Sequence, residues 1–218
     1  MKEKIKEIFS LSGVCKGDIF LNPALKEGRD VLREYYHDDH IIHAIKYFSR
    51  YDGYGELYCD LKAGFGAIST EVVGHFKNNQ LYEADEILVQ ILRINMSLKN
   101  ESGKNASSGW EIISERNYPE VKSVVRCETV ADLRGLLATE RPVIIFQNRK
   151  DEPIGGDIWS EISRAGHVGY VYSADLNKKR PLKTTWTLLT KGYAFKMTQL
   201  TPDDRLDKGD YIFLPKNL

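Results

Sequence analysis

The 218-residue sequence is short of cysteine and has no long apolar run. Its three cysteines, Cys15, Cys59 and Cys127, are widely spaced and odd in number, which argues against a disulfide scaffold and favours a reducing compartment. No stretch approaches the roughly 20 apolar residues that span a bilayer. The first residues, MKEKIKEIFSLSG, lack the apolar segment of a signal peptide. We therefore expect a cytoplasmic protein, or one secreted by a signal-peptide-independent route, with no membrane partner.

The sequence also lacks an excess of charge and the common motifs of catalytic and cofactor sites. Lys plus Arg and Asp plus Glu number 31 each, so there is no cationic excess to neutralise nucleic-acid phosphates. It contains no C-x-x-C, no G-x-x-x-x-G-K-S/T, no G-x-G-x-x-G and no G-x-S-x-G. These absences exclude a zinc ribbon and the common phosphate, dinucleotide and serine-hydrolase motifs, and nucleic acid is not an expected partner.

A small, polar segment divides the sequence into two parts. Residues 100–109 contain no apolar side chain larger than alanine, which is typical of a linker. Helical patterns precede this segment, whereas strand and helix patterns alternate after it. We predict a helical domain over 1–99 and an α+β domain over 110–218. The expected fold class is α+β, with an N-terminal helical bundle followed by a smaller, mostly antiparallel α+β domain.

Four helices are expected in the first part. Asn22-Pro23 begins a helix that ends near residue 37, because Asn caps free amides and Pro is tolerated at the first helical position. A second helix follows Asp38 or Asp39, and two more are expected over 56–77 and 80–98. The apolar stripe of the second helix consists of Ile41, Ile42, Ile45 and Phe48.

Short apolar runs predict strands in the second part. A helix that Thr129 caps is expected to follow the first of them. The expected strands cover 121–127, 143–146, 167–173, 186–189, 193–197 and 211–214.

The segment 128–175 carries a resemblance to a known family. Residues 164–172 read RAGHVGYVY, in which His167 opens a β-rich run. This run follows the segments Glu128–Leu133 and Arg141–Ile145. The order of these pieces resembles the layout of papain-like cysteine amidases and peptidases, including the NlpC/P60 and C39-like branches. In those families the histidine lies beside the thiol of a cysteine at a helix N-terminus.

The resemblance implies a catalytic constellation for amide hydrolysis or acyl transfer. His167 would take the proton of a cysteine thiol, and Asp175 or Asn177 would orient its imidazole ring. Cys59 is the leading nucleophile because it lies near the start of the third expected helix, and the other two cysteines are alternatives. The implied substrate is a peptide or cell-wall peptide, and no cofactor is implied.

A histidine-rich cluster is the second chemical feature. On one helix, Asp39, His40 and His43 would share a face, and imidazole with carboxylate suits Zn, Mn, Fe or Ni. We favour the alternative interpretation, in which the histidines face water and the aspartates cap a helix, because the H-E-x-x-H spacing is absent. The cluster consists of His37, Asp38, Asp39, His40 and His43, with Glu71 or His75 as a distant ligand.

Tyrosines gather in the first part and motivate a second functional hypothesis. Tyrosine offers a large contact area with few rotatable bonds and is common in interfaces. The chain would then be a non-catalytic interaction protein, such as an adaptor, an immunity-type inhibitor or a secretion or phage accessory factor, with a protein or peptide partner. The expected binding face consists of Tyr35, Tyr36, Tyr47, Tyr51, Tyr54 and Tyr58.

Overall fold

The structure is a computed structural model. It describes residues 14–16, 19–21, 39–101, 108–139, 141–149, 154, 157–174, 195–202, 204 and 206–218.

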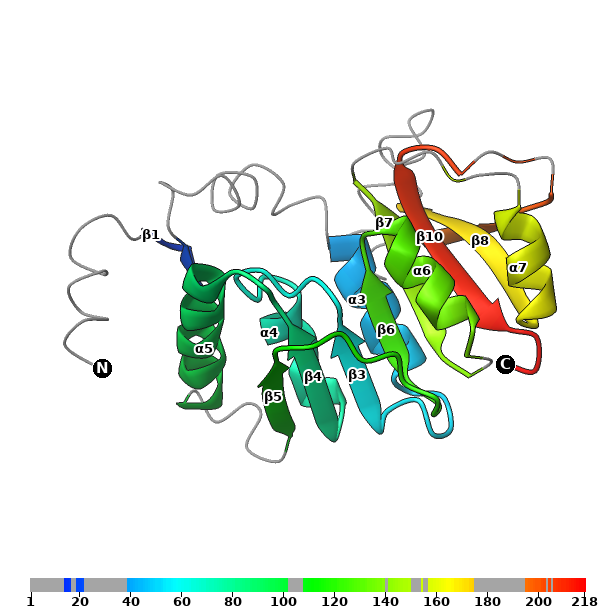
Figure 1. The fold of residues 1–218 in the computed structure, drawn as a ribbon. Helices are drawn as coiled ribbons and strands as arrows, with labels where there is room; N and C mark the ends of the chain where they lie inside the picture. The colour runs from blue at the N-terminus through cyan, green and yellow to red at the C-terminus, as the bar shows by residue number, and fades with distance from the viewer. Residues whose placement is uncertain are drawn as a thin grey trace, which may run out of the picture.

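One eight-stranded sheet organises the described part of the chain (Figure 1). Five neighbouring strands are parallel: β5 (Gly109–Ile113), β4 (Asn78–Tyr82), β3 (Leu57–Asp60), β6 (Val124–Cys127) and β7 (Val143–Asn148). The sheet continues with β10 (Gly209–Pro215), β8 (His167–Ala174) and β9 (Phe195–Gln199), each antiparallel to its neighbour. The strand order reverses at β3, because β4 and β5 extend the sheet on one side and β6 and β7 on the other.

Helices cover both faces of this sheet. The first face packs against α3 (Asp39–Phe48), α4 (Ser69–Val72), η1 (Val73–His75) and α5 (Glu86–Glu101), whose apolar residues join one buried cluster. The second face packs against α6 (Val130–Leu137) and α7 (Ile158–Arg164), which belong to another cluster. Figure 1 shows α6 and α7 in front of the sheet and α3 behind it. This is a doubly wound α/β arrangement with antiparallel strands at one side.

The two clusters follow from the alternation of side chains along each strand. In β7, Val143 and Ile145 belong to the first cluster, whereas Ile144 and Phe146 belong to the second. All six residues of β7 are buried. A strand covered on both faces needs such a continuous apolar run, as the sequence predicted for residues 143–146.

A short N-terminal hairpin packs against α5. It pairs β1 (Val14–Lys16) with β2 (Ile19–Leu21), and the Phe20 side chain is buried. The buried side chain of Asn95 accepts a hydrogen bond from the Phe20 amide at 2.8 Å. The Asn95 amide group donates to the carbonyl oxygens of Phe20 at 3.0 Å and Phe65 at 2.7 Å. Asn95 therefore joins the hairpin to the loop that follows β3.

Two helices predicted from the sequence are confirmed. The helix α3 begins at Asp39 and buries Ile41, Ile45 and Phe48, as its apolar spacing indicated. Thr129 caps α6, because its side-chain oxygen accepts a hydrogen bond from the Asp132 amide at 3.1 Å. The first expected helix, over 22–37, lies outside the described residues.

The predicted fold class is wrong. The third expected helix, over 56–77, contains the strand β3 followed only by the short helices α4 and η1. The fourth, over 80–98, forms the helix α5 from Glu86 onward, but the end of β4 occupies its first residues. Tyr58 and Cys59 lie in the middle of the sheet, and Gly64 and Gly66 belong to a loop after β3. The first part of the chain is therefore not a helical bundle, and the sheet is mostly parallel between β5 and β7.

Strands from both sides of residues 100–109 belong to the one sheet, since β5 pairs with β4. The division of the chain into 1–99 and 110–218 stays a prediction. Within the part of the chain that the structure describes, no helix has the length and apolar character that a membrane crossing requires.

Shortening a buried side chain of β7 tests the double-sided core. Ile145→Ala should lower the free energy of unfolding by about 2–5 kcal/mol, because Ile145 is fully buried and the surrounding strands cannot collapse around the cavity. Urea titration followed by circular dichroism measures this. Val121→Ala is the control, since Val121 is 50% exposed, and it should change stability by less than about 0.5 kcal/mol. Equal losses of stability in the two variants would contradict the placement of Ile145 in a buried core.

Candidate functional site

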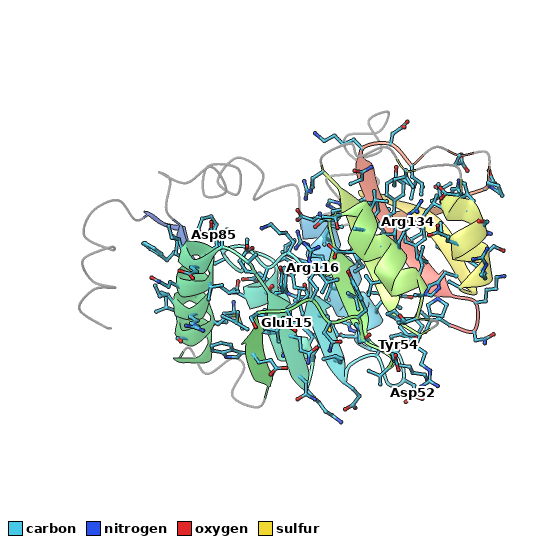
Figure 2. All side chains as sticks on the ribbon, viewed as in Figure 1. Asp52, Tyr54, Asp85, Glu115, Arg116 and Arg134 are labelled. Carbon is cyan, nitrogen blue, oxygen red and sulfur yellow. The ribbon has the colours of Figure 1, made fainter. Side chains whose placement is uncertain are left out.

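The strand order reverses at β3, so the carboxyl ends of β3, β4 and β6 lie at a topological switch point. We call the edge of the sheet that these strand ends form the crevice, after the position at which open α/β sheets bind ligands. In open α/β sheets, ligands bind outside the carboxyl ends of the strands at such a switch point. Figure 2 labels Asp85, which follows β4, at one edge of the sheet, and Asp52 and Tyr54, which precede β3, at the opposite edge. The segments that follow the parallel strands therefore form the rim of one site.

Polar side chains form a row across the first face of the sheet at this edge. Asp60, Arg126 and Gln147 are the last first-face residues of β3, β6 and β7, and all three are buried. Asp60 is the register partner of Arg126, and Gln147 is the partner of Asp210 at the start of β10. We call these four residues the polar row.

Arg126 holds the polar row together. Its Nη1 donates to Asp60 Oδ1 at 2.8 Å and to the Lys62 carbonyl oxygen at 2.7 Å. Its Nε donates to Gln147 Oε1 at 2.6 Å, and its Nη2 donates to Glu128. A buried guanidinium requires such partners, because an unpaired charge is costly away from water. Arg126 thus ties three strands to the loop after β3.

Asp60 receives further hydrogen bonds from its own side of the crevice. Ser69 Oγ donates to Asp60 Oδ2 at 2.7 Å, and the Lys62 amide donates to Oδ1 at 3.1 Å. The Tyr58 hydroxyl donates to Oδ2 at 3.1 Å. Burial, and then the charge of Asp60, hold the pKa of Tyr58 well above its usual range, so Tyr58 stays a donor. The Asp60 carboxylate is therefore fully engaged as a structural anchor.

The loop after β3 meets an acidic side chain that follows β4. Glu83 is 3% exposed, and its Oε2 accepts a hydrogen bond from the Gly64 amide at 3.0 Å. Its Oε1 accepts from the amides of Ala84 at 2.9 Å and Asp85 at 3.1 Å. Lys62 Nζ donates to both carboxylate oxygens, at 3.1 and 2.9 Å. Glu83 is thus held rigidly at the rim of the crevice.

Two glycines shape this loop. Gly64 and Gly66 have φ values of 55° and 83°, in the left-handed region that favours glycine. A Cβ on Gly66 would lie 2.7 Å from Leu92 Cδ1, so this position packs against α5. A Cβ on Gly64 would meet nothing within 4 Å. The backbone at Gly64 therefore borders open space beside Glu83.

The crevice is acidic. In the part of the chain that the structure describes, carboxylates at the rim of the crevice outnumber cations. The helix that follows the loop, α4, has only four residues. A short helix has a weak dipole and adds little attraction for a phosphate group. The carboxylates are Asp60, Glu83, Asp85, Glu128 and Asp132, and the cations are Lys62, Arg116 and Arg126.

Cys59 does not lie at a helix N-terminus. It occupies the centre of the sheet in β3, is 1% exposed, and its Sγ lies 3.6 Å from Gln80 Oε1. Burial, with smaller effects of the charges of Asp60 and Glu111, raises the pKa of the Cys59 thiol to about 12. Cys59 is therefore a protonated core residue at neutral pH.

His167 lies far from Cys59. It begins β8 and is 2% exposed, with Nδ1 3.1 Å from the Ala165 carbonyl oxygen and Nε2 3.0 Å from that of Pro142. From β3 to β8 the sheet makes four strand steps, which amount to roughly 19 Å at about 4.8 Å each. The structure does not bring the two side chains together. Asp175 and Asn177 lie outside the described residues.

The other two cysteines do not supply the thiol either. Cys127 is buried at the end of β6, and burial raises the pKa of its thiol well above the usual range. Cys15 lies in β1, a strand of the hairpin, and not at a helix N-terminus. The hypothesis of a papain-like cysteine amide hydrolase is wrong, because its nucleophile, base and helix do not form one site.

The hypothesis of a non-catalytic interaction protein is also wrong, because the described tyrosines among the six do not share one exposed helical face. Tyr58 lies in β3 and is fully buried, and Tyr54 is 4% exposed in the turn before it. Tyr47 is exposed on α3, where its hydroxyl lies 2.7 Å from that of Tyr51. Tyr35 and Tyr36 lie outside the described residues. A protein or peptide partner stays a prediction.

The histidine cluster is divided between described and undescribed residues. His37 and Asp38 lie outside the described part of the chain, whereas His40 and His43 lie on α3. Among the residues that the structure describes, no three His, Cys, Asp or Glu side chains are placed to share a metal ion. His40 instead contacts Asp210 of the polar row.

The polar row and Glu83 were not among the functional residues predicted from the sequence. The sequence does carry a signal for the polar row. In three strands a polar residue stands two positions after an apolar residue: Tyr58-Cys59-Asp60, Val124-Val125-Arg126 and Ile145-Phe146-Gln147. Such a polar residue lies on the same face of its strand as the apolar residue before it. Because 56–77 was predicted to be helical, Asp60 was not placed at the end of a strand.

The buried thiols should resist alkylation in the folded chain. With a pKa near 12 instead of 9.0, the thiolate fraction of Cys59 at pH 8 falls about a thousandfold. Peptide mapping after brief treatment with iodoacetamide should find Cys59 and Cys127 unmodified, and both should react after unfolding in urea. Rapid native labelling of Cys59 would contradict its placement.

Removing the cation of the polar row should destabilise the chain strongly. Arg126→Met leaves the Asp60 carboxylate buried without its counter-ion and should cost about 3–5 kcal/mol of the free energy of unfolding. The double variant Asp60→Asn with Arg126→Met should recover part of this loss. Urea titration of both variants measures the effect, and a double variant no more stable than the single one would contradict the pairing.

No family model and no curated protein matches the sequence. Magnesium protoporphyrin IX methyltransferase from Synechocystis PCC 6803, solved with bound SAM, is 11% identical, with 86% of this chain and 83% of that chain covered and a TM-score of 0.48. Geranyl diphosphate methyltransferase, solved with GPP and sinefungin, is 11% identical, with 87% and 81% covered and a TM-score of 0.47. Neither of these two similar structures is a cysteine amidase or peptidase.

Proposed function

We propose that this chain binds S-adenosylmethionine in the crevice at the carboxyl ends of β3 and β4 and transfers its methyl group to an acceptor. The observation that carries the proposal is the buried carboxylate of Glu83 beside the open backbone of Gly64. In doubly wound sheets an acidic residue about 20 positions after the glycine-rich loop hydrogen-bonds the ribose of a nucleotide. Glu83 follows the loop at this spacing and comes directly after the neighbouring strand, β4.

The charge of the crevice favours one class of nucleoside. The carboxylates at its rim would repel the pyrophosphate of NAD or ATP, and the four-residue α4 offers little compensating dipole. S-adenosylmethionine carries a sulfonium and an ammonium group and no phosphate, so its charge has the sign that an acidic crevice attracts. This argument supports a cationic nucleoside over a dinucleotide.

The residues present accommodate such a ligand if one side chain moves. Lys62 Nζ now binds both oxygens of Glu83, which ribose hydroxyls would otherwise reach. The Lys62 side chain is 41% exposed, so it can turn its ammonium group to water at small cost. Gly64 has no side chain to obstruct the approach of a ligand to the loop backbone.

Each residue then has a defined role in binding. Glu83 accepts hydrogen bonds from ribose hydroxyls, and the amides of Gly64, Ala84 and Asp85 keep its carboxylate in place. Arg126 and Asp60 hold the end of β3 and the loop in register. When bound, S-adenosylmethionine supplies an electrophilic methyl group.

Isothermal titration calorimetry of the full chain tests the proposal. Wild type should bind S-adenosylmethionine and should bind NAD⁺ more weakly. Glu83→Gln should weaken S-adenosylmethionine binding about tenfold or more, because hydrogen bonds to a carboxylate contribute roughly 1.5–3 kcal/mol. Lys62→Ala should strengthen binding by about threefold, because the ion pair between the part-exposed Lys62 and Glu83 no longer has to break.

Lys77→Ala is the matched control. Lys77 forms an exposed ion pair with Glu56 at 2.6 Å, and both residues precede strands at the opposite edge of the sheet. This substitution should leave the affinity for S-adenosylmethionine unchanged. No binding by either wild type or Lys62→Ala, or tighter binding of NAD⁺, would overturn the proposal.

A further inference from the structure

The second face of the sheet is covered unevenly. The apolar cluster that α6 and α7 complete contains residues of β3, β6 and β7, whereas none of its described members belongs to β4 or β5. Residues 114–123, which join β5 to β6, are all described and contain no helix. Among the described elements, Figure 1 shows no helix in front of β4 and β5. This part of the second face is therefore left open.

A groove of about 690 Å³ occupies the open area. Gln80 of β4 and Glu111 of β5 line it, and Gln80 Nε2 donates to Glu111 Oε1 at 2.8 Å. Val121 and Lys122, which precede β6, line it from the other side, and Val121 is 50% exposed. Since β5 is the edge strand of the sheet, its free edge borders the groove.

The free edge of β5 carries backbone groups without partners. The Gly109 amide donates to the Lys77 carbonyl oxygen at 2.9 Å, so the backbone groups of Gly109 and Glu111 point toward β4. Because this direction alternates along a strand, the amide and carbonyl groups of Trp110 and Ile112 point away from the sheet. No described residue pairs with these groups. Such an edge is a template for the addition of another strand.

The two sides of β5 differ in chemistry. Trp110 and Ile112 are partly buried and pack against the apolar cluster of the first face. Glu111 lies between them in the sequence, points to the opposite face and is exposed in the groove. A strand added beside β5 would therefore meet an apolar surface on one side and a carboxylate on the other.

The carboxylate of Glu111 is not balanced by the lysines that border the groove. Lys122 Nζ donates to the Asp52 carbonyl oxygen at 3.3 Å. Lys77 Nζ pairs with Glu56 Oε1 at 2.6 Å. Glu111 itself contacts the neutral amide of Gln80, and none of the ion pairs among the described residues includes it. The groove thus has a negative charge at the centre of the free edge.

We propose that the free edge of β5 binds an extended peptide as an added antiparallel strand, with a lysine or arginine opposite Glu111 and an apolar residue on each side of it. The outward backbone groups of Trp110 and Ile112 supply the hydrogen bonds, which are independent of the side chains of the peptide. Side chains alternate across the added strand, so its basic residue faces the groove and its apolar neighbours continue the surface of Trp110 and Ile112.

This inference is independent of the proposed function. The groove is lined by residues at the amino ends of β3, β4 and β5, such as Leu57, Asn78 and Gly109. The crevice lies at the carboxyl ends of the strands. Binding of a peptide and binding of S-adenosylmethionine therefore use different edges of the sheet.

Fluorescence anisotropy with the full chain tests the proposal. The probe is a labelled peptide of sequence Gly-Thr-Val-Lys-Val-Thr-Gly, which should bind saturably. Glutamate in place of its lysine should weaken binding about tenfold, because like charges directly opposite each other repel. Proline in place of both valines should weaken binding about tenfold or more, because it removes the amides that bond to β5. Absence of binding, or equal binding of the proline peptide, would overturn the proposal.

A charge exchange identifies the residue that selects the peptide. Glu111→Lys should bind the lysine peptide about tenfold more weakly than wild type and should prefer the glutamate peptide. Glu86→Lys is the matched control, since Glu86 is exposed at the start of α5 and does not line the groove. It makes the same change in net charge and should keep the affinity within about twofold of wild type. Equal effects of the two variants would refute the role of Glu111.

Sedimentation equilibrium distinguishes the peptide from a second copy of the chain. The mass of the wild-type chain should be the same with and without the lysine peptide. A dimer that the peptide dissociates would show that a second copy occupies the edge, and would overturn the proposal. Glu111→Lys should bind S-adenosylmethionine as wild type does, so a chain that binds the peptide but not S-adenosylmethionine would refute the proposed function alone.

Discussion

The buried guanidinium of Arg126 is the contact on which the arrangement of the crevice depends. It joins β3 through Asp60, β7 through Gln147 and the loop after β3 through the Lys62 carbonyl oxygen. A charge buried at 5% exposure is tolerated only when its donors are satisfied, so the surrounding acceptors must keep their places. Removing one partner therefore disturbs three strands and the glycine loop together.

The polar row that Arg126 organises is a consequence of sheet register. Along each strand, alternate residues point to the same face, and apolar residues fill that face until the carboxyl end, where one polar residue follows. Parallel pairing of β3, β6 and β7 then brings these last residues side by side. An apolar core thus ends in a polar edge, and this edge is where the fold can bind a ligand and hold His40 in place.

Elements distant in sequence support the same edge from outside the sheet. Asn95 of α5 binds the carbonyl oxygen of Phe65 in the glycine loop and also both backbone groups of Phe20 in the N-terminal hairpin. Glu83 binds the Gly64 amide from the end of β4. The conformation of the loop after β3 therefore depends on segments that are 19 to 75 residues apart in the chain.

The sequence by itself determined the elements whose signals are local. Apolar spacing located α3, the Thr129 cap located the start of α6, and a continuous apolar run located β7. It did not determine β3 and β4, because Leu57-Tyr58-Cys59 is too short to distinguish a strand from a helix by period. Only the tertiary structure decided that Asp60, Arg126, Gln147 and Asp210 meet, since pairing between strands far apart in the chain sets their register. Strand pairing also separates Cys59 from His167, which the resemblance in the sequence had associated. It brings His40 into contact with Asp210, although the two residues are 170 positions apart in the chain.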